Sequence, residues 1–167
     1  MPKRLLALEI RASRLGFAVL EGSTRLLDWG VRAFAEQNEN LRSAVSDRIA
    51  TLLAFHKPAA VVVRAQKYHS ADQNKRFLAI VAAIRAETTR NSTKFFVLSA
   101  RHVRAHFDPN GRVTKHDIAV NLAKQFEELS WKLPGRRKVY QSEAPAMLVF
   151  DALANGVSLV GRQAPST

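Results

Sequence analysis

The chain has 167 residues, enough for one domain with its own core, and 47% of them are hydrophobic, as in ordinary globular proteins. It contains no cysteine, which excludes a disulfide framework, a zinc ribbon and a thiol nucleophile, and which suits a reducing, cytoplasmic compartment. No apolar run approaches the ~18 residues that a membrane span needs, so we expect no signal peptide, no anchor and no membrane partner.

Positive charge is the strongest compositional signal. The chain has 26 Lys and Arg against 14 Asp and Glu, a formal net charge of +12. The stretch from Lys57 to Lys115 holds twelve basic and three acidic residues, a net charge of +9. Such a surface attracts polyanions, chiefly nucleic acid. The basic residues are dispersed along the stretch, which favours a folded binding face over a basic protein that has no such partner.

Three apolar runs open the chain, over residues 4–10, 15–21 and 25–34. Tight connections separate them, and this pattern predicts an antiparallel meander of three strands. The spacing then becomes helical. From Asn40, a capping residue, apolar positions recur on one face until Pro58 excludes further helix.

The second half of the chain alternates strands with helices. Residues 59–64 are β-branched and apolar without alternation, which is typical of a strand covered on both faces. We expect a single domain over residues 1–161 and a loose tail over 162–167. The other expected elements are a helix from near Asp72 or Asn74, a strand over 94–98, a short helix over 99–107, a helix that opens with the capping box Thr114 and Asp117 and carries its apolar face to Leu129, and a last helix from Ser142 or Pro145 through Asn155 and Gly156.

This order of elements predicts an α/β fold: a five-stranded mixed sheet, three antiparallel strands and then two parallel ones, with helices on both faces. The first strand is then central, between the second and the fourth. Ligands of open α/β sheets bind where the strand order switches, at the carboxyl ends of the strands. That position lies between Glu9 and Arg64, which end the first and fourth strands.

Several stretches resemble the RuvC-type Holliday junction resolvases of the ribonuclease H-like superfamily. Residues 6–21, LALEIRASRLGFAVLE, are similar to that family's opening strand, acidic residue, Ser-Arg pair and second strand. Residues 56–66, HKPAAVVVRAQ, resemble its Pro-led fourth strand. Weaker similarity continues through 79–87, 100–107 and 111–126, so that the resemblance covers about residues 5–156. The YqgF-type relatives, linked to RNA processing, share this layout.

The resemblance implies a metal-dependent phosphodiesterase. Its three or four carboxylates would hold two divalent ions, Mg²⁺ or Mn²⁺, which activate water and stabilise the leaving oxygen. On this sequence the four carboxylate positions fall on Glu9, Arg64, Glu143 and Ala146, so two of the four acids remain.

A second alignment of the last helix also fits the family's final motif. It offers Asp151 as the fourth acid but leaves Leu148 at the third position and lengthens the preceding loop, so Glu143 is preferred. The candidate catalytic residues are therefore Glu9, Glu143 and Asp151. Any metal would be held by Glu9 and Glu143.

Arg64 is the informative departure from the family pattern. A guanidinium ~4 Å from a divalent ion, at an effective dielectric of about 20, costs roughly 8 kcal/mol of repulsion before relaxation. We therefore expect no bound metal or other cofactor, and an Arg64 that pairs with Glu9 and Glu143 in the place of the ions. Mg²⁺ or Mn²⁺ would be required if the site were active.

The favoured interpretation is a nucleic-acid-binding protein with little or no nuclease activity, with branched DNA as the expected partner and RNA as the alternative. Two other functions stay open: an active Mg²⁺- or Mn²⁺-dependent endonuclease, and a non-catalytic scaffold for protein partners. The resemblance also implies a homodimer. The candidate contacts to the phosphate backbone are Lys67, Lys75, Arg76, Lys115, His116, Arg136, Arg137 and Lys138.

Overall fold

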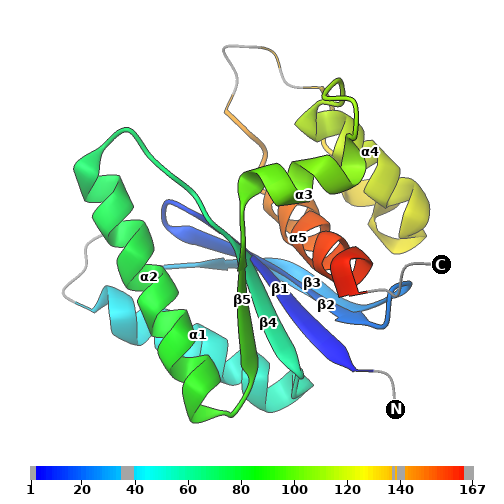
Figure 1. The fold of residues 1–167 in the computed structure, drawn as a ribbon. Coiled ribbons are helices and arrows are strands. Elements are labelled where there is room, and N and C mark those ends of the chain that lie inside the picture. The colour runs from blue at the N-terminus through cyan, green and yellow to red at the C-terminus, as the bar shows by residue number, and fades with distance from the viewer. Residues whose placement is uncertain (1–2, 35–39, 137, 139–141, 164–167) are drawn as a thin grey trace.

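A five-stranded mixed sheet forms the centre of the computed structural model, which describes residues 3–34, 40–136, 138 and 142–163 (Figure 1). The strand order is β3-β2-β1-β4-β5. The first three strands pair antiparallel, and the last two extend the sheet parallel to β1, as the sequence predicts. The strands are β1 (Arg4–Arg11), β2 (Arg14–Glu21), β3 (Arg25–Ala33), β4 (Ala60–Arg64) and β5 (Lys94–Leu98).

Helices cover both faces of this sheet (Figure 1). One face is covered by α1 (Leu41–His56) and α2 (Ala71–Arg90). The other carries α3 (Ala100–Phe107), α4 (Lys115–Gln125) and α5 (Met147–Gln163). The predicted capping box at the start of α4 is present, with Thr114 and Asp117 bonded reciprocally.

The alternation of side chains along β1 assigns its residues to two separate cores. Leu6, Leu8 and Ile10 pack with α1 and α2, while Leu5 and Ala7 pack with the helices of the opposite face. Successive strand residues point to opposite faces. Glu9 and Arg11 therefore lie on the face that α5 covers.

Helix α5 packs closely against the sheet at two glycines. A Cβ at Gly156 would lie 2.9 Å from the side chains of Ala7 and Leu20. A Cβ at Gly16, the β2 residue paired with Glu9, would overlap the backbone of Leu148. The absence of a side chain at both positions lets the start and the middle of α5 pack directly on β1 and β2.

Two features of the carboxyl-terminal region differ from expectation. The last helix begins at Met147, two residues after Pro145 and five after Ser142, the two predicted starts, and it continues past Asn155 and Gly156 to Gln163. A 3-10 helix, η1 (Glu127–Lys132), follows α4, where the sequence pattern predicted that the α-helix would continue. Within the described ranges, no helix combines the length and apolarity that a membrane crossing requires.

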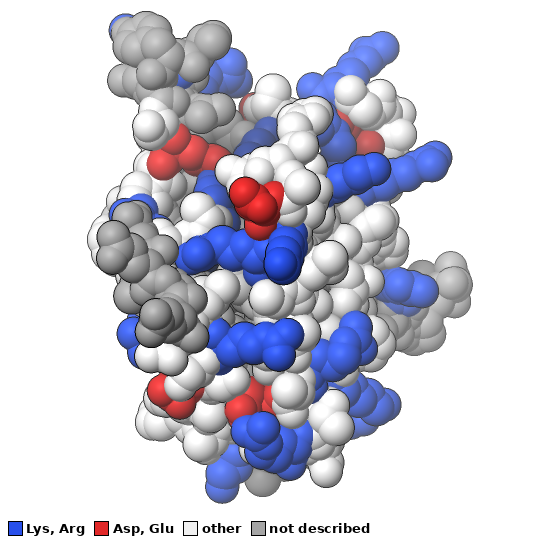
Figure 2. Space-filling view, turned by 90° about the vertical axis from the view of Figure 1, so that its left-hand side faces the viewer, with Lys and Arg blue, Asp and Glu red and all other residues white. Residues whose placement is uncertain are grey.

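Basic side chains are spread over the face formed by α1 and α2, with few acidic ones between them (Figure 2). Two of these basic residues, Lys75 and Arg76, lie in the first turns of α2, near the end of the sheet where β1 and β4 finish. The high net charge is therefore carried on the surface of a folded unit, as its dispersal in the sequence predicted.

Candidate functional site

The carboxylate of Glu9 is fully buried at the carboxyl end of β1 and has three side-chain partners. Arg64 donates to its Oε1 from Nη2 at 2.7 Å, and Gln66 donates to the same oxygen at 2.5 Å. Asn155, on α5, donates to Oε2 at 2.9 Å and to the carbonyl oxygen of Leu8 at 2.8 Å. Glu9 thus links the ends of two strands to the last helix.

Arg64 ends β4 beside β1, and its guanidinium forms an ion pair with Glu9. Burial alone would lower the pKa of Arg64, but the charge of Glu9 and the hydrogen bond to it outweigh burial and raise this pKa above its ordinary value. Arg64 is therefore a permanent cation in this position. Within the described residues its ionic partner is Glu9; Glu143, which we also expected it to contact, pairs with other cations.

A second group of charges lies beside this pair and forms a closed ring of ion pairs. Arg11 contacts both Glu143 and Asp151, the latter at 3.0 Å. Lys115 contacts the same two carboxylates, Glu143 at 2.5 Å and Asp151 at 2.9 Å. We call these four residues the ionic ring. Both acids between which the sequence alignment had to choose are members of it.

The two carboxylates of the ionic ring are held differently. Asp151 lies on α5, and its side chain is 9% exposed. Burial raises its pKa above the ordinary value and the charge of Glu9 adds to this rise, while Lys115 and Arg11 act against it. Glu143 precedes α5 by four residues, lies outside any helix and is 23% exposed.

The Glu9–Arg64 pair and the ionic ring together carry no net charge. Three carboxylates, Glu9, Glu143 and Asp151, are paired with three cations. The cations are Arg11, Arg64 and Lys115.

These residues do not fit the pair of divalent ions that the family resemblance implies. Two such ions require several anionic oxygens whose charge is not already neutralised. Here each acid faces at least one Lys or Arg, and both oxygens of Glu9 accept hydrogen bonds from protein groups. Across the described part of the chain, no three His, Asp or Glu side chains are grouped so that they could hold a metal ion. Ala146, at the family's fourth position, lies in the turn before α5 and supplies no ligand.

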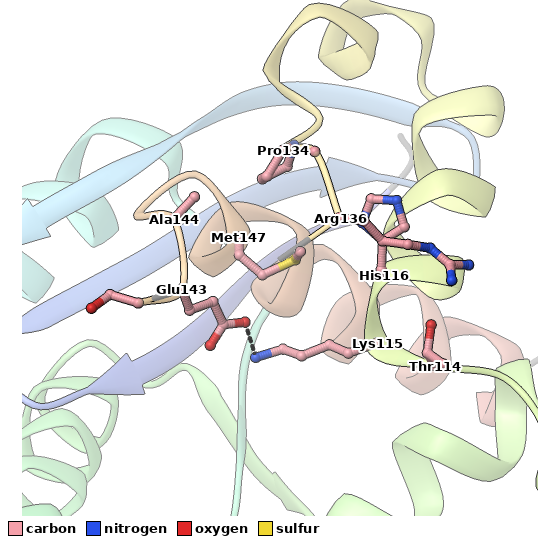
Figure 3. A pocket seen from close by; sticks show the side chains of 10 residues that line it. Thr114, Lys115, His116, Pro134, Arg136, Glu143, Ala144 and Met147 are labelled. Atoms are coloured by element: carbon pink, nitrogen blue, oxygen red, sulfur yellow. Dashed lines mark ion pairs between the residues drawn. The ribbon is translucent and has the colours of Figure 1, made fainter. Parts of the chain in front are cut away.

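Three hollows border the ionic ring, and one of them, of about 240 Å³, is lined by Glu9, Arg64, Lys115 and Asp151. The other two open beside Glu143 and Arg11. The larger, of about 690 Å³, is lined by Lys115, His116, Arg136 and Glu143, with the Lys115–Glu143 pair at its edge (Figure 3). The smaller, of about 240 Å³, is lined by Arg11, Arg76 and apolar residues of α2. The Arg11–Glu143 ion pair joins the two.

The structure divides the predicted phosphate contacts into two groups. The segment that joins β4 to α2 contains Lys67, and the first turns of α2 contain Lys75 and Arg76. Both lysines are exposed. Lys115, His116 and Arg136 line the larger hollow. Lys138 is exposed, and Arg137 lies outside the described residues.

Three contributors to the site were not identified from the sequence. Arg11 lies two residues after Glu9, a spacing that places both side chains on one face of a strand. Asn155 lies one helical turn after Asp151, which places both on one face of α5. Gln66 was noted only as part of a motif; it also accepts a hydrogen bond from the hydroxyl of Tyr68 at 2.7 Å.

Comparison with known proteins gives a fold but no close relative. No family model matches the sequence, and no curated protein matches it. Thermus thermophilus RuvC superposes with a TM-score of 0.70 at 18% identity, over 93% of this chain and 92% of that one. The same protein in complex with a Holliday junction substrate gives a TM-score of 0.73 at 16% identity, with the same coverage.

A yeast mitochondrial Holliday junction resolvase is similar as well. Its TM-score is 0.66 at 15% identity, and the match covers 97% of this chain and 80% of that one. The likeness therefore extends over nearly the whole chain in all three structures. From the strand order, the helices on both faces and this likeness, we conclude that the chain has the ribonuclease H-like fold of the RuvC-type Holliday junction resolvases.

Proposed function

We propose that the protein binds branched nucleic acid, with four-way DNA junctions as the favoured substrate, and that it does not cleave them by a metal-dependent reaction. The observation that carries this proposal is the pairing of Glu9, Glu143 and Asp151 with Arg or Lys. Carboxylates held by fixed cations are not free to bind metal ions, whereas the surrounding basic surface remains suited to phosphates.

The choice of a branched substrate is supported by the fold. Thermus thermophilus RuvC and a fowlpox virus resolvase, both structurally similar to this chain, have been solved in complex with Holliday junctions. A four-way junction has two-fold symmetry, so we further propose that the protein binds it as a homodimer. Sedimentation of the free protein and of the complex would measure the number of copies.

The first test compares a four-way junction with a linear duplex of the same sequence, over a series of salt concentrations and with Mn²⁺ or Mg²⁺ present. We expect preferential binding of the junction, a linear fall of log affinity with log salt, and no cleavage. Calorimetry should detect no tight binding of Mn²⁺ to the unmodified protein. Symmetric cleavage of the junction would instead identify an active endonuclease, and the absence of salt-dependent binding would favour a protein scaffold.

A second prediction concerns the basic segment before and within the first turns of α2. The triple variant K67Q/K75Q/R76Q should weaken junction binding on the order of tenfold or more. It should also reduce the salt slope by about 0.9 for each phosphate that the variant no longer neutralises. Gel-shift titrations at several salt concentrations measure both quantities.

A matched control for this variant is K3Q/K57Q/K94Q, which removes the same charge at the opposite end of the sheet. Lys3 precedes β1, Lys57 lies between α1 and β4, and Lys94 begins β5. Because these strands are parallel, the three lysines lie near their amino ends. Equal loss of affinity in the two triple variants would mean that net charge, rather than a defined face, determines binding.

A further inference from the structure

Arg11 and Lys115 form a two-cation site whose ligand, in this structure, is part of the protein itself. Both side chains contact the carboxylate of Glu143, and both also contact Asp151. The cations come from different elements, the end of β1 and the first residue of α4. The helix end itself is already satisfied by its capping box, so the site consists of side chains.

Of the two carboxylates, that of Glu143 is the one that can move away from Arg11 and Lys115. Asp151 is fixed in α5, whose backbone rests against Gly16 on the sheet. Glu143 lies in the non-helical segment before α5 and borders the 690 Å³ hollow (Figure 3). Within the described residues its ion pairs are those with Arg11 and Lys115. Its departure would leave two cations against one carboxylate, a local charge of +1.

A carboxylate that bridges two cations offers them the same pair of anionic oxygens that a phosphodiester offers. Arg and Lys both bind phosphate, Arg through its planar fork and Lys as a point charge. The hollow beside the pair is lined by two further basic residues, His116 and Arg136, along which a nucleic-acid backbone would continue.

We propose that Arg11 and Lys115 bind one backbone phosphate of the nucleic acid, and that the Glu143 carboxylate occupies this phosphate position until the nucleic acid displaces it. The inference rests on the proposed function for the identity of its ligand. It adds a defined phosphate site and a competing internal anion, so that part of the binding energy is used to release Glu143.

The test uses E143Q, which removes the competing charge and retains the size of the side chain. The matched control is E21Q. Glu21 also pairs with two arginines, Arg4 and Arg25, but at the opposite end of β1 and β2. Both variants raise the net charge by one, so any difference between them comes from the location of the freed cations.

Inorganic phosphate is the first probe, because its binding does not depend on recognition of a junction. Phosphate should raise the thermal unfolding midpoint of E143Q at concentrations about tenfold lower than for the unmodified protein or for E21Q. The double variant E143Q/K115Q should lose this gain. Equal responses of E143Q and E21Q, or a gain that persists without Lys115, would overturn the inference whatever the protein binds in solution.

Four-way junction DNA is the second probe. E143Q should bind it about tenfold more tightly because no internal anion has to be displaced, with an unchanged salt slope because the same phosphate is neutralised in both proteins, whereas E21Q should bind the junction as the unmodified protein does. If the unmodified protein and E143Q both fail to bind any nucleic acid while E143Q binds phosphate, the proposed function fails and the anion site stands. If the unmodified protein binds the junction but E143Q behaves as E21Q with both probes, the anion site fails alone.

Discussion

Replacing Arg64 with methionine is expected to lower the free energy of unfolding by about 3 kcal/mol at pH 7. The carboxylate of Glu9 is fully buried, and Arg64 is its ionic partner. A buried charge that loses its partner keeps its desolvation cost without the compensating attraction. Gln66 and Asn155 still donate to this carboxylate, so the effect should lie near the lower end of the range for broken buried pairs. Urea unfolding followed by circular dichroism measures the change.

The double variant E9Q/R64M identifies the origin of this loss. Removal of both charges leaves no uncompensated ion, so the double variant should recover most of the stability that R64M loses. The control is R25M: Arg25 pairs with Glu21 but is 71% exposed, and loss of such a surface pair should cost less than about 1 kcal/mol. An R64M variant no less stable than R25M would show that Glu9 does not depend on the Arg64 charge.

The second large effect is expected at Gly16, where alanine should lower the free energy of unfolding by about 2–3 kcal/mol. Its Cβ would lie 2.7 Å from the carbonyl carbon of Leu148 and closer still to the oxygen. Backbone atoms cannot rotate away as a side chain can, so the start of α5 must move off the sheet. Because this helix carries Asp151 and Asn155, the contacts of the ionic ring and of Glu9 should be weakened as well.

Gly135 provides the control for this prediction. It is exposed, and a Cβ there would meet no atom within 4 Å. G135A should therefore change the free energy of unfolding by no more than about 0.5 kcal/mol. Equal stabilities of G16A and G135A would contradict the close contact of α5 with β2. For variants that remain folded, junction binding by G16A should also be weaker than by G135A.

The order of elements was largely predictable because it depends on local patterns. Short apolar runs between tight turns predicted the meander, and the uninterrupted β-branched run over 59–64 predicted a strand buried on both faces, as β4 is. Asn155 and Gly156 were interpreted as a helix end because these residue types favour one locally. Packing overrides that preference: Gly156 permits contact with β1 and β2, and Asn155 donates to Glu9.

The site was predictable only in part. Arg64 and Glu9 lie at the ends of adjacent parallel strands, so the sequence order was enough to bring them together. The sequence favoured Glu143 over Asp151, whereas the turn before Met147 brings both acids to the same two cations. Arg11 was missed because the first strand was predicted to end at Ile10, one residue before it.

The charge balance of the site has a kinetic consequence for any polyanionic ligand. The three acids and three cations of the Glu9–Arg64 pair and the ionic ring cancel in charge. These six residues therefore add no net charge to a protein whose formal net charge is +12. Attraction over a distance comes from the outlying lysines and arginines, whose loss should mainly slow association. Within the ionic ring, a phosphate can replace Glu143 only after the nucleic acid has reached the protein. Substitutions in the ionic ring should therefore mainly alter the dissociation rate of the complex.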